Sequence, residues 1–441
     1  MSRLLIIQAT GYRMREVRVP YKLRKRKLVG AVLPYLAALV PKGWDVTLLD
    51  DATQEVNYDA DVDAVAITIR TVTSLRGYEI ARRFRDRNLP VLMGGPHATF
   101  HAEEMAEHAD AVCIGEAEGV FPRMLGDAAA GRLEKFYRRE SPAPLENMPA
   151  PRWDLLDSSK YVFYRPYVIQ YSRGCPYTCD FCAERRLNGD FGYRSRPVEE
   201  VVEEVRRCES RHIFFAASQF AGDKAHAMQL MEALVPLNIR WSTLISAHFC
   251  LDAKFMDLAK KSGLLHVNMG VESLDQETLL SMRKGFNRVR QYEEVLRNLT
   301  GRGISYSLNF VFGSDTEDED TFDATLRFLA EQKAETAYFN ILVPLRGTPL
   351  YDRLKAEGRL LDEENMERWP GLSCHFRPLR YTPEELVRRV ARIRQGFYTF
   401  RSVARRLPLP YKQSHFAAWN LNFLQKKVAK NIHSMRDFTE F

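Results

Sequence analysis

The chain has 441 residues, of which 45% are hydrophobic and 27% charged, so it is long enough for two or three globular domains. These fractions exclude a disordered or collagen-like chain, and no run approaches the roughly 20 apolar residues that span a bilayer. The net charge of +7 is uneven, because basic residues gather between Tyr12 and Lys27 and between Phe376 and Arg436. Segregated charge is typical of an anionic partner or a membrane surface, or of a solvated face. The N-terminal apolar run is too short for a secretory signal, so we expect a cytoplasmic protein.

Residues 1–139 alternate short apolar strands with amphipathic helices, which predicts an α/β, doubly wound, Rossmann-like sheet covered on both faces. Strands are expected at 4–8, 44–49, 64–69, 91–93 and 111–114, and helices at 29–40, 75–87 and 121–130. Such a sheet binds its ligand at the carboxyl ends of its strands. Several glycines follow these ends, and they would let a large flat ligand approach the backbone closely.

The stretch 140–151 contains four prolines and no periodic pattern, so residues 140–160 are expected to form a linker. About six strand–helix units follow, from a strand at 168–171 to a strand at 336–343. This number is typical of a partial or full parallel barrel, and we assign a partial (β/α)6 barrel to residues 161–350. Residues 351–441 are expected to be helical and basic.

Three of the seven cysteines stand together as Cys175-x3-Cys179-x2-Cys182, directly after the first predicted barrel strand. Parallel barrels place their chemistry at such strand ends. Structural zinc would need a fourth tight ligand, and the next cysteine or histidine is Cys208, inside a predicted helix. Thiolates also hold iron–sulfur clusters, where four cysteines fill a cubane and three leave one iron open to a small chelating molecule.

This spacing, with the aromatic Phe181 before the last cysteine, resembles the radical S-adenosylmethionine (SAM) enzymes. In that family the open iron of a [4Fe-4S] cluster binds SAM, and reduction cleaves SAM to methionine and a 5′-deoxyadenosyl radical. The stretches 269–273, 281–285, 309–313 and 344–351 resemble the ends of the family's fourth, fifth and sixth strands.

The resemblance implies that Glu272 binds the ribose and that Arg283 or Lys284 binds the methionine carboxylate. Family members often carry an acidic or glycine-rich motif for the SAM amine where this chain has neutral residues, so Asp223 is an alternative amine contact. The SAM contacts implied in this way are Phe181, Ser218, Gln219, Glu272, Ser273, Arg283 and Asn309.

A doubly wound domain ahead of such a barrel resembles the cobalamin (B12)-binding subgroup of the family. Many cobalamin domains carry a histidine after the first strand that ligates cobalt, whereas this chain has QATG at 8–11. Arg70 would face the lower side of the corrin and, because it stays protonated, would leave that position open or water-bound; a surface or phosphate-binding arginine is the alternative. The implied cobalamin contacts are Thr10, Gly11, Arg70, Thr71, Ser74, Gly94, Gly95, Pro96, Gly115 and Glu116.

The resemblance implies an enzyme: a cobalamin-dependent radical SAM methyltransferase that methylates an unactivated carbon. The alternative is a radical SAM enzyme for cyclisation or carbon–carbon coupling, with a structural front domain. A nucleic-acid-binding module is disfavoured, because the basic ends lack interleaved base-stacking repeats or a recognised RNA fold.

The expected partners are a small-molecule, lipid, tetrapyrrole or peptide substrate and a low-potential reductant such as flavodoxin or ferredoxin, with no nucleic acid. The stretch 397–427 mixes aromatic and cationic residues. It favours either peripheral association at the inner membrane face or a helix packed across the barrel mouth.

Overall fold

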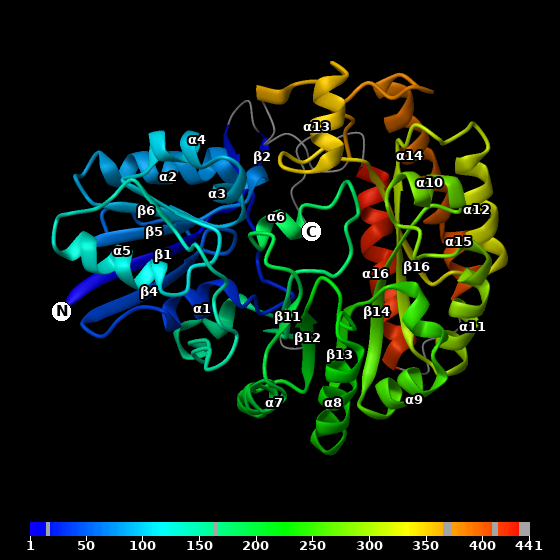
Figure 1. Ribbon diagram of the computed structural model, residues 1–441, viewed down its shortest axis with the longest axis horizontal. Helices are drawn as coiled ribbons and strands as arrows, with labels where there is room; N and C mark the ends of the chain where they lie inside the picture. Colours follow the sequence, from blue (N-terminus) through cyan, green and yellow to red (C-terminus); the bar gives the residue numbers. More distant parts are fainter. Residues whose placement is uncertain (15–17, 163–165, 365–371, 408–412, 432–441) are drawn as a thin grey trace.

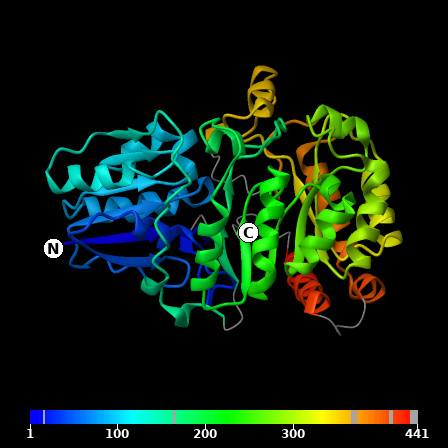
Figure 2. The same cartoon turned by 60° about the horizontal axis from the view of Figure 1, so that its bottom comes forward.

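The computed structural model describes residues 1–14, 18–162, 166–364, 372–407 and 413–431. Two α/β domains lie side by side, the front domain in blue and cyan and the second in green and yellow (Figure 1). Figure 2 shows the same arrangement from a view turned by 60°.

The front domain is built on a parallel sheet of six strands in the order β4-β1-β5-β6-β7-β8. The strands are β1 (Ser2–Gln8), β4 (Trp44–Asp50), β5 (Ala64–Thr68), β6 (Val91–Gly94), β7 (Ala111–Ile114) and β8 (Phe136–Arg138). β1 pairs with β4 on one side and with β5 on the other, so the strand order reverses at β1. A ligand crevice is expected at such a point, here at the carboxyl ends of β1 and β5. The short hairpin of β2 (Tyr12–Met14) and β3 (Val19–Pro20) follows β1.

Helices cover both faces of this sheet, as the sequence predicts. Leu5 and Ile7 pack with α2 and α4 on one face, whereas Leu4 and Ile6 pack with α1 and α5 on the other. This alternation follows from the two-residue period of a strand. The helices are α1 (Val32–Ala38), α2 (Ser74–Arg85), α3 (Pro96–Phe100), α4 (Ala102–His108) and α5 (Val120–Ala129).

The second domain is a parallel sheet with its strands in chain order, β9-β12-β13-β14-β15-β16. Within the described residues no ladder joins β16 to β9, so the barrel is partial, as expected. The strands are β9 (Tyr167–Gln170), β12 (His212–Ala216), β13 (Arg240–Leu244), β14 (Leu264–Glu272), β15 (Ser305–Phe312) and β16 (Thr336–Ile341). The hairpin of β10 (Ser172–Arg173) and β11 (Arg194–Ser195) stands beside β9.

The barrel helices each bury one apolar stripe, and α7 (Val198–Arg207) is an example. Val201, Val202 and Val205 recur at helical spacing and are buried, while glutamates fill most of the other positions. The helices are α6 (Glu184–Leu187), α7 (Val198–Arg207), α8 (Lys224–Leu234), α9 (Ala253–Lys261), α10 (Gln276–Ser281), α11 (Tyr292–Gly301) and α12 (Thr321–Glu331).

The C-terminal region is helical, as expected. It consists of α13 (Pro349–Ala356), α14 (Pro383–Phe397), α15 (Phe400–Arg406) and α16 (Gln413–Asn431). The middle of α16 packs where β16 begins, because the Asn422 side chain donates to the carbonyl of Glu335 at 2.7 Å. The expectation of a helix across the barrel mouth is therefore wrong for this part of α16, which meets the amino end of the strand. No helix of the described residues is both long and apolar enough to cross a membrane.

Candidate active site

The three clustered cysteines lie on the loop that follows β9 and β10, at the carboxyl end of the barrel. Burial raises the pKa of the Cys175 and Cys179 thiols, that of Cys179 to about 12, and the nearby ammonium of Lys284 opposes this effect at both. Gly174 opens the loop with a φ of +77°, and a Cβ there would lie 2.0 Å from the carbonyl oxygen of Gly192. Glycine at 174 therefore lets the chain turn from β10 into the cysteine loop.

The sequence left two metal sites open for the three cysteines, a zinc ion and an iron–sulfur cluster. A zinc ion with Zn–S bonds of about 2.3 Å holds its sulfur atoms about 3.8 Å apart. In the described parts of the chain, the one group of three ligand atoms within 4.8 Å of one another is His97, His101 and Glu104. The three thiols are not in that group, and the cluster is assigned to them from their spacing in the sequence and from their place at the carboxyl end of the barrel.

A buried ion pair stands beside the cysteine loop. The Nζ of Lys284 lies 2.7 Å from Oε1 of Glu272, which ends β14 with a φ of +62°. Burial alone would lower the pKa of Lys284, but Glu272 and Cys179 outweigh burial and raise it, so the ammonium stays charged. It also lies 5.9 Å from the ring centre of Phe181. The neighbouring Arg283 is exposed, so Lys284 is the residue that faces the thiols.

The other residues implied in SAM binding occupy different environments. Ser218 is exposed and lines a cavity between the domains. Gln219 is buried, and its side chain bonds Ser246 and the amide of Ala221, which ties together the loops after β12 and β13. The amide of Asn309 donates to Asn268 at 2.6 Å. Asp223 accepts from the amide of His226, and Ser273 accepts from that of Asp275.

A cavity of about 470 Å³ lies between the front domain and the barrel. Gln170, Arg173 and Ser218 line it from the barrel side. Gly95, Pro96 and Gly115 line it from the front domain, and the same three residues line a second cavity of about 250 Å³ inside the front domain. The two cavities therefore adjoin at the carboxyl ends of β6 and β7.

The cavity inside the front domain fits a ligand that buries an apolar group at the strand ends. Its walls include Leu92, Phe121 and Met124, and Arg70 lies at its edge. A Cβ on Gly95 would lie 2.6 Å from the carbonyl oxygen of Ile69, so glycine here lets the loop pack against the residue after β5. The close approach of a ligand to these glycines stays a prediction. The implied contacts in this wall are Arg70, Gly94, Gly95, Pro96 and Gly115.

The remaining implied cobalamin contacts do not line this cavity. The amide of Thr10 donates to Asp51 at 3.2 Å, and Gly11 accepts from the amide of Tyr21. Thr71 bonds the ring of His97, and Ser74 is buried at the start of α2. These four residues, Glu116 and the five that line the cavity all remain predictions as cobalamin contacts.

The structure gives Glu116 a contact that the sequence did not indicate. Its carboxylate lies 2.9 Å from Arg173 and 2.5 Å from Arg194, both in the barrel domain. The side chain is 7% exposed and bonds across the domain boundary.

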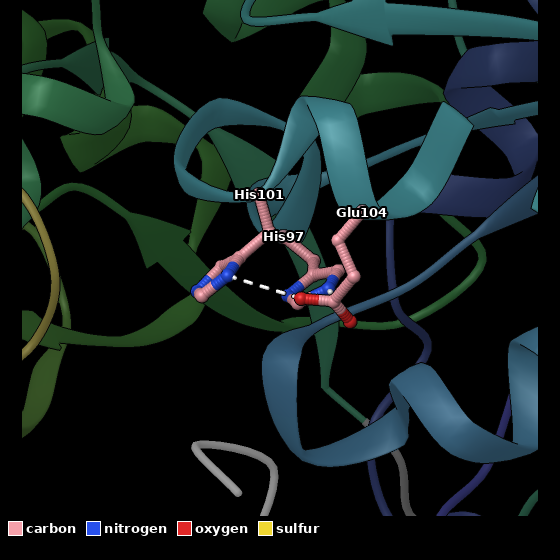
Figure 3. A group of neighbouring side chains, drawn as sticks. All are labelled: His97, His101 and Glu104. Atoms are coloured by element: carbon pink, nitrogen blue, oxygen red, sulfur yellow. Dashed lines mark ion pairs between the residues drawn. The ribbon is translucent and has the colours of Figure 1, made fainter. Parts of the chain in front are cut away.

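The group of His97, His101 and Glu104 lies on α3 and α4, and Figure 3 shows its side chains converging. His97 uses both ring nitrogens, at 3.1 Å from the hydroxyl of Thr71 and 2.9 Å from that of Tyr78. Tyr78 also donates to Glu104 at 2.9 Å. Protein groups thus already engage His97 and Glu104, and the bonds anchor the helix that follows the Gly94–Pro96 turn.

Two cations of the basic stretch 12–27 are paired within the front domain. Lys22 lies 3.1 Å from Asp51, and Arg26 lies 2.7 Å from Asp50, at the carboxyl end of β4. Arg15 falls outside the described residues. Part of this charge therefore stabilises the strand end rather than facing a partner.

Comparisons with known proteins agree with this geometry. Residues 169–329 match the Radical SAM superfamily, and residues 30–125 match the B12 binding domain. The chain is 28% identical to the bacteriochlorophyllide d C-12(1)-methyltransferase of Chlorobaculum tepidum, over 90% of this chain and 88% of that protein.

A second relative is the hopanoid C-2 methylase of Rhodopseudomonas palustris, 26% identical over 75% of this chain and 65% of that protein. The fold matches that of the cobalamin-dependent SAM radical enzyme OxsB with a TM-score of 0.71, at 14% identity over 98% of this chain and 72% of that chain. The chain belongs to the radical SAM enzymes that carry a B12-binding domain.

Proposed function

We propose that the protein is a C-methyltransferase that uses SAM and cobalamin to methylate a carbon atom of a tetrapyrrole. The observation that carries the proposal is the adjoining pair of cavities, which share Gly95, Pro96 and Gly115. One cavity reaches into the front domain, and the other faces the barrel strand ends near the cysteine loop. The tetrapyrrole class is supported by the relative from Chlorobaculum tepidum, which aligns along 90% of this chain.

When bound, the [4Fe-4S] cluster with SAM supplies a radical that removes hydrogen from carbon, and cobalamin supplies the methyl group. Cys175, Cys179 and Cys182 would hold the cluster. Lys284 would bind the SAM carboxylate, because its ammonium is buried, charged and beside the thiols. Glu272 would hold both Lys284 and the ribose.

The chain's remaining task is to position the substrate and exclude water. An unactivated carbon has no acidic proton for a general base, so orientation rather than acid–base catalysis is the protein's main contribution. The cavity between the domains is the space in which a substrate can meet both cofactors.

The test is an anaerobic assay with a low-potential reductant, deuterated-methyl SAM and a bacteriochlorophyllide d acceptor. A methylated tetrapyrrole together with 5′-deoxyadenosine and S-adenosylhomocysteine supports the proposal, and the Cys179→Ala variant should form none of them. Deoxyadenosine without S-adenosylhomocysteine would favour cyclisation or coupling. Methylation of a hopanoid but not of the tetrapyrrole would overturn the substrate class.

We also infer that the C-terminal helices contact an anionic membrane surface. Phe416 and Phe423 of α16 are 60% and 49% exposed, and Lys426 lies over the ring of the exposed Phe400. Exposed aromatic and basic side chains together are typical of a peripheral membrane contact. Co-sedimentation with anionic vesicles should fall in a Phe416→Ser/Phe423→Ser variant, and equal binding would reject this role.

A further inference from the structure

We propose that Glu116 and Glu118 of the front domain and Arg173 and Arg194 of the barrel form an interdomain clamp that holds the cavity rim in fixed register with the cysteine loop. The clamp would set the relative position of the two cofactors, so this inference rests on the proposed function. Its residues are positioning residues, which act through the loops they hold.

The clamp is a connected set of buried charges. Arg173 lies 2.9 Å from Glu116 and also pairs with Glu118, while Arg194 lies 2.5 Å from Glu116. The four side chains are 7–17% exposed. Arg173 therefore bridges two carboxylates with one guanidinium, which fixes direction as well as distance.

Further hydrogen bonds hold both carboxylates in place. The backbone amide of Ala143 donates to Glu116 at 2.7 Å, and Arg194 donates to the carbonyl of Ala143 at 2.8 Å. The hydroxyl of Tyr35 donates to Glu118 at 2.6 Å. Burial would raise the pKa of Glu116, but Arg194, Ala143 and Arg173 together lower it, so the carboxylate stays ionised.

Each side of the clamp is joined directly to a functional loop. Glu116 follows Gly115, which lines both cavities. Arg173 lines the cavity between the domains and stands two residues before Cys175. Arg173 is also the strand partner of Arg194 in the β10–β11 hairpin, so the two arginines move together. A shift of one domain would have to break these contacts before the cavity rim could move away from the cysteine loop.

The chemical nature of the clamp favours a positioning role over a purely stabilising one. A buried ion pair is weak evidence for stability, because its desolvation cost can exceed the Coulomb gain. A buried pair does require one relative position of its two side chains, however. The best-documented role of buried charged groups is to fix the register of the elements that carry them. Misplacement of reacting groups by about 1 Å can cost about 100-fold in rate.

The decisive variant is Glu116→Gln, which keeps the shape of the side chain and removes its charge. Glu204→Gln is the control, since Glu204 forms a 2.5 Å pair with Arg196 that is more deeply buried, at 5–6% exposure, but lies within the barrel. The first measurement is electron paramagnetic resonance of reduced holoenzyme that contains cob(II)alamin and a reduced cluster. The second is the ratio of 5′-deoxyadenosine to methylated product.

We expect wild type and Glu204→Gln to show the same spin–spin coupling between the two cofactors. Compared with wild type at equal cobalamin and iron content per chain, Glu116→Gln should show a broadened or lost coupling, with roughly 10- to 100-fold more deoxyadenosine per methylated product. An unchanged coupling in Glu116→Gln would overturn the clamp. The same loss in Glu204→Gln would also overturn it, because the effect would then be general.

If Glu116→Gln does not accumulate as holoenzyme, Arg194→Lys at the more exposed end of the clamp carries the same test with the same outcomes. The spin coupling does not depend on turnover. A wild-type enzyme that shows coupling but forms no methylated product would therefore refute the proposed function. The comparison of coupling between wild type and Glu116→Gln would still test the clamp.

Discussion

Gly174 and Gly192 offer a matched pair of substitutions around the cysteine loop. Both have a φ of +77°, so an alanine at either position would be held in a left-handed backbone conformation that is unfavourable for it. They differ in space: a Cβ on Gly174 would lie 2.0 Å from the carbonyl oxygen and 2.9 Å from the carbonyl carbon of Gly192. A Cβ on Gly192 would meet no atom of the described chain within 4 Å.

These distances give the expected magnitudes. The left-handed conformation costs roughly 1–2 kcal/mol for a non-glycine residue, which both variants share. Gly174→Ala adds overpacking of about 1–3 kcal/mol, since the obstructing atoms are backbone and cannot rotate away. The strand beyond Gly192 carries Arg194, so the displacement should reach the clamp as well as Cys175.

The assay is calorimetric unfolding of anaerobic holoenzyme, together with iron content per chain. Each kcal/mol should shift the Tm of a barrel of this size by about 2–4 °C, so Gly174→Ala should unfold well below Gly192→Ala and retain less iron. Equal Tm and equal iron content in the two variants would refute the account of the β10–β11 hairpin as a close backbone contact.

Three further predictions concern the cavities and the buried charges. Gly95→Ala should lose most bound cobalamin while keeping its iron, because its Cβ would lie 2.6 Å from the carbonyl oxygen of Ile69; full cobalamin absorbance would count against the cavity as the site. Lys284→Gln should raise the Kd for SAM at least about 10-fold, as expected for a charged hydrogen bond of about 1.5–3 kcal/mol, whereas Gln at the exposed Arg283 should change it little. Burial raises the pKa of Glu317 to about 8, so the folded state holds a proton there that the unfolded state has released above its ordinary value of 4.5. The contribution of Glu317 to stability should therefore fall by about 1.4 kcal/mol per pH unit between these two values, and Glu317→Gln should reduce the total slope by that amount in denaturation curves at pH 6 and 7.5; an unchanged slope would place the proton elsewhere.

The sequence predicts the strands of both sheets to within a few residues, because each is a short apolar run bounded by turn residues. It does not predict β8, whose three residues include two exposed ones and give little apolar signal. The placement of α16 was also open, since the contact of Asn422 with Glu335 joins residues 87 positions apart.

The candidate site shows the same division between local and long-range information. The cysteine spacing is a local pattern, and the sequence alone points to its chemistry. Glu116 was assigned to cobalamin from its place after a strand, and the partners it has in the structure, Arg173 and Arg194, are 57 and 78 residues away. The choice between Arg283 and Lys284 depends on the backbone turn at Arg283, which has a φ of +55° and leaves the arginine exposed.

The electron paramagnetic resonance spectrum of the reduced, anaerobically purified protein, recorded before and after SAM is added, tests whether Cys175, Cys179 and Cys182 hold a cluster with an open iron. Three thiolates that leave one iron free should give a four-iron signal whose g values change when SAM binds, and Cys182→Ala should abolish it. A colourless protein that carries one zinc per chain, or a cluster signal that does not change with SAM, would show that these cysteines do not hold a cluster with an open iron.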